Sequence, residues 1–227
     1  MAEPVAINCQ TCHPDHHAAQ RELYMGIGGQ DTVPKAGPMF LARVSCEGCH
    51  IGHKGNSIEG VTRVAEPAAC MSCHGTSYAH IQDGWTQGLG NLINQLTPYV
   101  QLVAAELKKA ESGGTTDIRE AEKLYQRATH NIELVRYGKA AHNVEYSSQL
   151  VESARKNLDE ALKSVGSTHR VPMLEQPAIP AGGTCLNCHF GIETNVSEFG
   201  GKTFPHIRHT LAAQLDCSVC HSSQPKG

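Results

Sequence analysis

Cys46-Glu47-Gly48-Cys49-His50 is one copy of a five-residue phrase that occurs five times in this sequence of 227 residues. The other copies are Cys9-Gln10-Thr11-Cys12-His13, Cys70-Met71-Ser72-Cys73-His74, Cys185-Leu186-Asn187-Cys188-His189 and Cys217-Ser218-Val219-Cys220-His221. Together the five phrases contain all ten cysteines of the chain. A repeated pattern that uses every cysteine indicates one kind of site built five times.

Cys-x-x-Cys-His is the attachment sequence of a c-type haem. The two thiols form thioether bonds to the haem vinyl groups, and the adjoining histidine binds the iron as its proximal ligand. The sequence therefore predicts five covalently bound haem c groups, with their irons, as cofactors. The predicted attachment residues are the cysteines Cys9, Cys12, Cys46, Cys49, Cys70, Cys73, Cys185, Cys188, Cys217 and Cys220 and the proximal histidines His13, His50, His74, His189 and His221.

Three other uses of paired cysteines fit the sequence less well. Structural disulfides do not require a histidine after the second cysteine. Zinc sites built from thiolates combine two such phrases, and five phrases leave one unmatched. A thioredoxin-like redox motif belongs in a strand–helix–strand context that this sequence does not offer.

These phrases make the chain similar to the multihaem cytochromes c, here with five haems, which carry electrons in bacterial anaerobic respiration. The resemblance implies a fold organised by haems and an electron-transfer function with redox proteins as partners. It also implies a location outside the cytoplasm, in the periplasm or at the cell exterior, where haem is attached in this way.

The composition agrees with a haem-organised interior. Aromatic residues make up only 5% of the chain and charged residues 18%, so conventional aromatic core material is scarce. We expect the apolar porphyrin faces to supply much of the interior, and the folded apoprotein to be marginal or absent.

Net charge and hydropathy limit the classes of partner that the sequence leads us to expect. The formal net charge of −3 gives no reason to expect a nucleic-acid partner, and no apolar run approaches the roughly 18 residues of a membrane-spanning helix. Met1-Ala2-Glu3-Pro4 lacks the basic and apolar regions of a signal peptide, so we expect an export signal to have been removed.

The spacing of the phrases divides the chain into four regions. Residues 1–83 form an N-terminal region with three haem phrases, and residues 84–165 form a helical segment without haem attachment. Residues 166–184, rich in proline and glycine, form an extended connector, and residues 185–227 hold the last two haems. The expected fold class is mainly α with extensive loops, built around a central antiparallel helical segment.

Apolar residues in the helical segment recur at the three- and four-residue spacing of amphipathic helices. These stripes pack the helices on one another, or alternatively form coiled-coil-like contacts between two copies of the chain. The stripe positions are Leu89, Leu92, Ile93, Leu96, Val100, Val103 and Leu107, then Ala121, Leu124, Tyr125, Ala128, Ile132 and Val135, then Tyr146, Leu150, Ala154, Leu158 and Leu162.

Proline, glycine and capping residues set the expected ends of these helices. Pro98 predicts a kink or a restart in the first helix. Asp117 with Glu120 resembles a capping box for the second helix, and Asn143 is a candidate N-cap for the third. The glycines that end the three helices are Gly113, Gly138 and Gly166. A further short helix is expected near residues 21–29, followed by a loop.

Nine histidines remain besides the five proximal ones, so every iron could have a second histidine ligand. His17 lies one helical turn beyond His13 and on the same side of that haem, and His53 lies similarly close to His50. Either residue would therefore ligate the iron of a different haem. Bis-histidine ligation implies low reduction potentials.

Resemblances to known multihaem cytochromes indicate which of the nine histidines are ligands. Phe204-Pro205-His206-Ile207-Arg208-His209 is similar to the paired-histidine motif of the cytochrome c3 and c7 class, in which the two histidines ligate different haems. His17 lies in a segment similar to one that follows the first haem in related proteins. The segment around His142, His-Asn-x-x-Tyr, resembles the start of a long helix in these cytochromes, including relatives of pentahaem nitrite reductase.

Other candidates compete for the fifth distal position. They are His53, His80 and, as a weaker alternative, Met39, whereas His169 in the connector is a weak candidate and His16 is expected in solvent. His130 lies opposite the apolar stripe of its helix, so we expect a surface residue.

The leading functional hypothesis is a non-enzymatic electron carrier. An alternative is a reductase of nitrite, hydroxylamine or a similar small oxyanion at a haem with an open coordination position, although the Cys-x-x-Cys-Lys phrase of pentahaem nitrite reductase is missing. A second alternative is a homo-oligomer or a subunit of a conductive cytochrome filament, in which a histidine ligates a haem of the next subunit.

Overall fold

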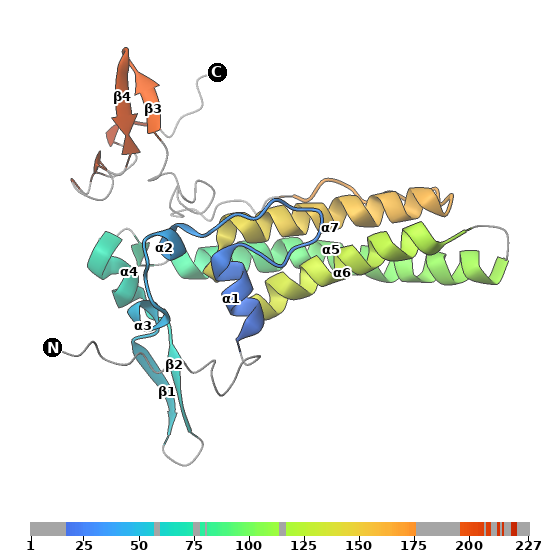
Figure 1. The fold of residues 1–227 in the computed structure, drawn as a ribbon, viewed down its shortest axis with the longest axis horizontal. Coiled ribbons are helices and arrows are strands. Elements are labelled where there is room, and N and C mark those ends of the chain that lie inside the picture. The colour runs from blue at the N-terminus through green and yellow to red at the C-terminus, as the bar shows by residue number, and fades with distance from the viewer. Residues whose placement is uncertain are drawn as a thin grey trace. The chain divides into compact units, whose positions relative to one another are not determined.

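The computed structural model describes residues 17–56, 60–74, 78–79, 81–113, 117–175, 196–206, 208–209, 213, 215 and 219–221. Helices dominate these residues (Figure 1), which confirms the expectation of a mainly α protein. The first and fourth haem phrases, Cys217 of the fifth, and the candidate ligand His80 lie outside the described residues. No described helix is long and apolar enough to cross a lipid bilayer.

The chain forms two compact units, each built from two separate stretches of sequence. Unit 1 comprises Met1–Ala36 and Tyr99–Val171, and unit 2 comprises Gly37–Pro98 and Pro172–Gly227. The division therefore falls inside one helix, α5 (Ile81–Gly113), between Pro98 and Tyr99. The helix continues through Pro98 and does not restart there, and it ends at Gly113 as predicted.

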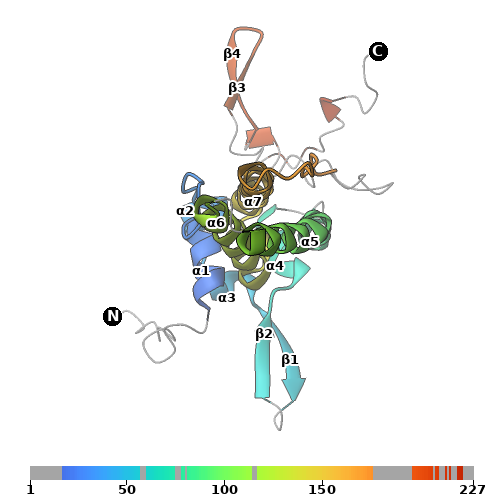
Figure 2. The ribbon, with the colours of Figure 1, turned by 90° about the vertical axis from the view of Figure 1, so that its right-hand side faces the viewer.

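Unit 1 is built on the helix pair α6 (Arg119–Gly138) and α7 (Val144–Ser164). The short turn between them makes the two helices antiparallel neighbours, and both views show them side by side (Figures 1 and 2). Every predicted stripe position of α7 is buried, and the stripe of α6 is buried or half-buried. The chain's own elements therefore cover the apolar surface that contacts between two copies would have used. Each leucine so buried contributes about 1.5–3 kcal/mol of hydrophobic stabilisation.

The ends of these helices follow from local chemistry. The Asn143 side chain accepts a hydrogen bond from the Tyr146 N–H at 3.1 Å, which confirms Asn143 as the N-cap of α7. Helix α6 ends at Gly138 as predicted. At its start, Asp117 accepts from the Arg119 N–H and pairs with the Arg119 guanidinium, so the helix begins at Arg119 and the expected capping box with Glu120 does not form.

Helix α1 (Ala18–Met25) packs against α6 and ends at Gly26, in agreement with the short helix expected there. The loop that follows is held on the helix pair by buried polar side chains. The fully buried Asn131 donates to the Gln30 carbonyl and accepts from the Gln30 N–H, both at 2.8 Å. The Tyr146 hydroxyl accepts from the Gly29 N–H at 2.9 Å. These bonds pair backbone groups of the loop with side chains of the two helices.

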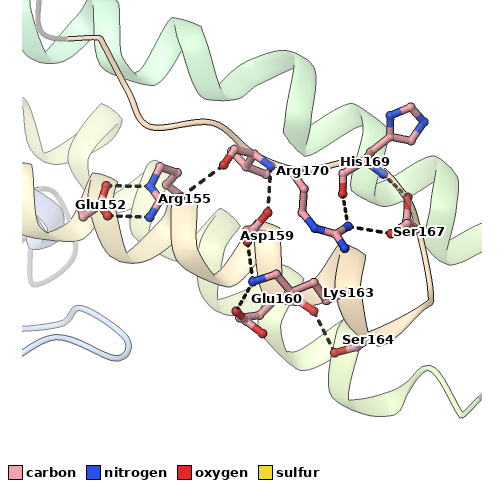
Figure 3. Close-up of polar contacts among 10 residues, drawn as sticks. Glu152, Arg155, Asp159, Glu160, Lys163, Ser164, Ser167, His169 and Arg170 are labelled. Carbon is pink, nitrogen blue, oxygen red and sulfur yellow. Dashed lines mark hydrogen bonds and ion pairs between the residues drawn. The ribbon is translucent and has the colours of Figure 1, made fainter.

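The connector begins by packing back along α7. Val171 is buried, and its N–H donates to the Asp159 carboxylate at 2.9 Å, while its carbonyl accepts from Arg155 at 3.3 Å. Figure 3 shows these polar contacts along α7, where Lys163 also forms an ion pair with Asp159 at 2.8 Å. Burial opposes ionisation of Asp159, but the hydrogen bonds from Lys163 and Val171 outweigh it and lower the pKa of its carboxyl.

Unit 2 contains short elements. In chain order they begin with α2 (Pro38–Leu41), α3 (Cys46–Cys49), β1 (Gly52–Asn56), β2 (Gly60–Val64) and α4 (Pro67–His74), followed by the first part of α5. Strands β1 and β2 form an antiparallel hairpin in which His53 lies opposite Arg63. A second hairpin joins β3 (Val196–Phe199) to β4 (Lys202–Pro205). Neither hairpin was predicted, because the strands are short and lack the alternation of apolar and polar residues that indicates a half-buried strand.

Candidate functional site

The second and third haem phrases lie on neighbouring short helices. Cys46 and Cys49 are the first and last residues of α3, and Cys70 and Cys73 both lie in α4, which contacts α3. Residues three apart project from the same side of a helix, so each pair of thiols faces one way. The Glu66 N–H at the base of α4 also donates to the Cys49 carbonyl at 3.3 Å.

The four thiols are close enough to influence one another. Burial raises the pKa of the Cys49 thiol, and the neighbouring thiol groups of Cys70, Cys46 and Cys73 raise it further. Burial likewise raises the pKa of Cys70. Within the part of the chain that the structure describes, no three Cys, His, Asp or Glu side chains are arranged to hold a bare metal ion. The described cysteines, which are Cys46, Cys49, Cys70, Cys73 and Cys220, carry free thiols, as thioether formation requires.

The proximal candidate His50 is oriented by the first hairpin. Its Nδ1 lies 3.3 Å from the carbonyl oxygen of Arg63 on β2. Because a carbonyl oxygen only accepts, Nδ1 carries the proton and Nε2 carries the lone pair. A histidine that ligates a metal through one nitrogen commonly donates the other N–H to such an acceptor. The third proximal candidate, His74, stacks on the ring of Tyr78 with centroids 4.5 Å apart.

Two predicted distal ligands have the same arrangement. The Nδ1 of His142 lies 2.7 Å from the Gly138 carbonyl oxygen and 3.0 Å from that of Lys139. The Nδ1 of His209 lies 3.1 Å from the Pro205 carbonyl oxygen. In both residues Nε2 is therefore the nitrogen with a lone pair for a metal.

His130 has the opposite arrangement. Its Nε2 lies 2.7 Å from the carbonyl oxygen of Gly28, so its proton is on Nε2 and the ring ties α6 to the loop after α1. The side chain is exposed, as expected of a surface residue. Its hydrogen bond shows in addition that this histidine has a structural role, which the helical pattern did not reveal.

The remaining candidates occupy varied positions. His206 and His209 both contact Phe204, His206 edge-on at 5.4 Å and His209 stacked at 4.0 Å between ring centroids. The structure thus brings this predicted pair together. His17 is exposed at the N-cap of α1, and His53 is exposed on β1.

The two weaker candidates lie apart from these groups. Met39 is half-buried in α2. His169 is exposed, and its N–H donates to the Ser167 hydroxyl at 3.2 Å in the segment that packs on α7 (Figure 3).

Large apolar side chains are exposed beside the haem phrases. Phe40, Leu41 and Ile51 flank the second phrase, and Leu215 and Val219 lie beside or within the fifth. A planar apolar group attached at these phrases would cover such surface. Free thiols, histidines with the lone pair on Nε2 and adjacent apolar surface are the features that covalent haem attachment needs, and the described residues fit it.

Sequence reasoning missed the carbonyl acceptors of the histidines predicted to be ligands. For His142 a signal was present, since Gly138 and Lys139 precede it by the four- and three-residue spacing of one helical turn. For His50 no local signal exists, because Arg63 is brought to it by the hairpin.

Comparison of the chain with protein families, with characterised proteins and with solved structures found no match.

Proposed function

We propose that this chain is a multihaem cytochrome c that transfers electrons through five covalently attached haems. The observation that carries the proposal is the fivefold Cys-x-x-Cys-His phrase, which uses every cysteine of the chain. Each haem, when bound, supplies an iron that accepts and releases one electron.

The chain's own residues hold and orient the iron-binding groups. Pairs of thiols on α3 and α4 anchor two neighbouring cofactors, and the Arg63 carbonyl fixes the ring of His50. A donated Nδ1–H increases the electron density at Nε2 and fixes the direction of its lone pair. This arrangement at His142 and His209 supports distal histidine ligation and hence low reduction potentials.

We expect the mature protein to act outside the cytoplasm with redox proteins as partners. Electrons would enter and leave at haem edges near the surface, and axial ligands, haem exposure and nearby charges would set the individual potentials. All irons would have two protein ligands, so substrate reduction would not take place at them.

The test is to produce the chain through a competent cytochrome-maturation system and to measure its mass, its Soret absorption and its low-temperature electron paramagnetic resonance spectrum. Added mass of five haems and solely low-spin ferric signals would support the proposal. Zinc in place of haem, or a mass equal to that of the bare polypeptide, would overturn it.

A matched pair of variants sharpens this test. His142→Ala should convert one low-spin iron in five to the high-spin form, because the iron loses its distal ligand. His130→Ala should leave every iron low-spin, because the His130 Nε2 is bonded to the Gly28 carbonyl. Equal spectra for the two variants would contradict the assignment of His142.

The paramagnetic resonance spectrum and the particle size distinguish the electron carrier from the two alternative functions. A high-spin iron in the unaltered protein would favour reduction of a small oxyanion such as nitrite or hydroxylamine. Particle size that grows with protein concentration would favour a filament subunit or another homo-oligomer.

A further inference from the structure

We propose that the turn formed by Gly138 and Lys139 is a positioning element for the His142 imidazole, and that it holds this ring in place for ligation. The inference rests on the proposed function in one respect, namely that His142 binds an iron. Three independent observations carry it.

The first observation is the double hydrogen bond to the imidazole. Both carbonyl oxygens of the turn face the Nδ1 of His142, at 2.7 Å for Gly138 and 3.0 Å for Lys139. An imidazole N–H that donates to two carbonyl oxygens restricts rotation of the ring more than one that donates to a single oxygen. It also keeps the lone pair on Nε2.

The second observation is the backbone conformation of Lys139. This residue ends α6 with φ 57° and ψ 101°, a region that side-chain-bearing residues seldom occupy. Strained backbone of this kind persists only where the surroundings determine it, and it gathers at functional sites. Here the conformation turns the chain sharply from α6 into the short helix Ala140–His142 that carries the imidazole.

The third observation is the close packing of Gly138 on α1. A Cβ atom at this position would lie 2.7 Å from the Ala19 carbonyl oxygen and 2.6 Å from a methyl carbon of Leu23. The turn is thus seated directly on the backbone of α1, and a larger residue would displace it.

The chain is also held in place on the other side of His142, at the start of α7. Asn143 donates to the Lys35 carbonyl at 2.7 Å and caps α7, and the Ser147 hydroxyl donates to the Ala140 carbonyl at 3.3 Å. His142 therefore lies between two fixed points, the Gly138–Lys139 turn and the start of α7. Its ring orientation is set by the scaffold before any iron is bound.

The test measures how often the distal ligand leaves the iron. Carbon monoxide binds a ferrous haem only when its sixth position is open, so its binding rate in the reduced holoprotein reports dissociation of the distal ligand at each haem. Loss of an outer-shell partner typically weakens a metal–ligand bond about 10–100-fold. Gly138→Ala should therefore raise the rate of carbon monoxide binding by about 10–100-fold at one haem in five, with the other four unchanged.

Variants of Lys139 provide a second measurement and a control for folding. Lys139→Val should accelerate binding at the same haem, because a β-branched residue does not tolerate positive φ. Lys139→Gly should match the unaltered protein, because glycine adopts this φ freely and the side chain takes no part. Far-UV circular dichroism verifies that the helices of each variant are intact.

The possible results distinguish failure of this inference from failure of the proposed electron-transfer function. If His142→Ala opens one haem while Gly138→Ala and Lys139→Val bind carbon monoxide at the original rate, the inference is wrong and the electron-transfer proposal stands. If His142→Ala opens no haem, His142 is not a ligand and the inference fails at its base. If the mature protein carries no haem, both fail.

Discussion

Two glycines that end helices in unit 1 form a natural matched pair. Gly26 ends α1 with φ 69°, and Gly166 follows α7 with φ 70°. Each N–H donates to the carbonyl three residues earlier at 2.9 Å, and the next residue completes the same six-residue capping motif, also at 2.9 Å. The two sites therefore have the same backbone conformation and the same capping bonds.

The space around them differs. A Cβ at Gly166 would meet no atom within 4 Å, whereas a Cβ at Gly26 would overlap the carbonyl of Lys35. Gly166→Ala should thus cost only the left-handed conformation, about 1–2 kcal/mol. Gly26→Ala pays this cost and also displaces Lys35, whose N–H donates to the Gly26 carbonyl at 2.8 Å. Loss of that bond adds about 1 kcal/mol, and further strain brings the total to about 2–4 kcal/mol.

The assay is urea unfolding of the haem-loaded protein followed by far-UV circular dichroism at neutral pH. Gly26→Ala should lower the free energy of unfolding by clearly more than Gly166→Ala, with similar slopes against urea concentration. Equal losses for the two substitutions would refute the packing of the Gly26 turn against Lys35.

Two further predictions concern polar groups inside unit 1. Asn131→Leu should lower the free energy of unfolding by about 1–3 kcal/mol, because the Gln30 N–H loses its acceptor, while the Gln30 carbonyl keeps the hydrogen bond from the Ser153 hydroxyl at 3.2 Å. A loss below about 0.5 kcal/mol would contradict this. Asp159 has a lowered pKa in the folded chain, so its stabilising effect is present above the ordinary titration range of aspartate and is lost as the pH falls through the folded pKa. Asp159→Asn, which keeps an acceptor for Val171 but loses the charge facing Lys163, should therefore be less stable than the unaltered protein at neutral pH. The gap in urea midpoints should close on acidification, and a gap independent of pH would count against the assignment.

The helices could be predicted because short-range rules determine them. The N-cap at Asn143, the glycines that end α5 and α6, and the stripes of α6 and α7 all follow from residues within a few positions of one another. Pro98 is an exception, because it lies inside α5 without ending the helix.

What the sequence did not reveal depends on contacts between distant residues. Asn131 meets Gln30 and Tyr146 meets Gly29, pairs separated by 101 and 117 positions, and no local pattern indicates such partners. The same holds for His130, whose acceptor Gly28 lies 102 positions away. The acceptors of His142, by contrast, lie four and three residues before it and were within reach of a local pattern.

The two kinds of segment in this chain differ in what supplies their interior. Leu150, Ala154, Leu158 and Leu162 of α7 are fully buried, so the helical part of unit 1 has an aliphatic core of its own. Between residues 37 and 79, by contrast, Ala69 and Tyr78 are the apolar side chains described as buried, and several larger ones face solvent. An apolar group bound where the Cys-x-x-Cys-His phrases lie would cover this surface, whereas the helix pair buries its own apolar stripes. Because the helix pair packs on its own residues, the turn at Lys139 can fix the orientation of the His142 ring through the carbonyls of Gly138 and Lys139 alone.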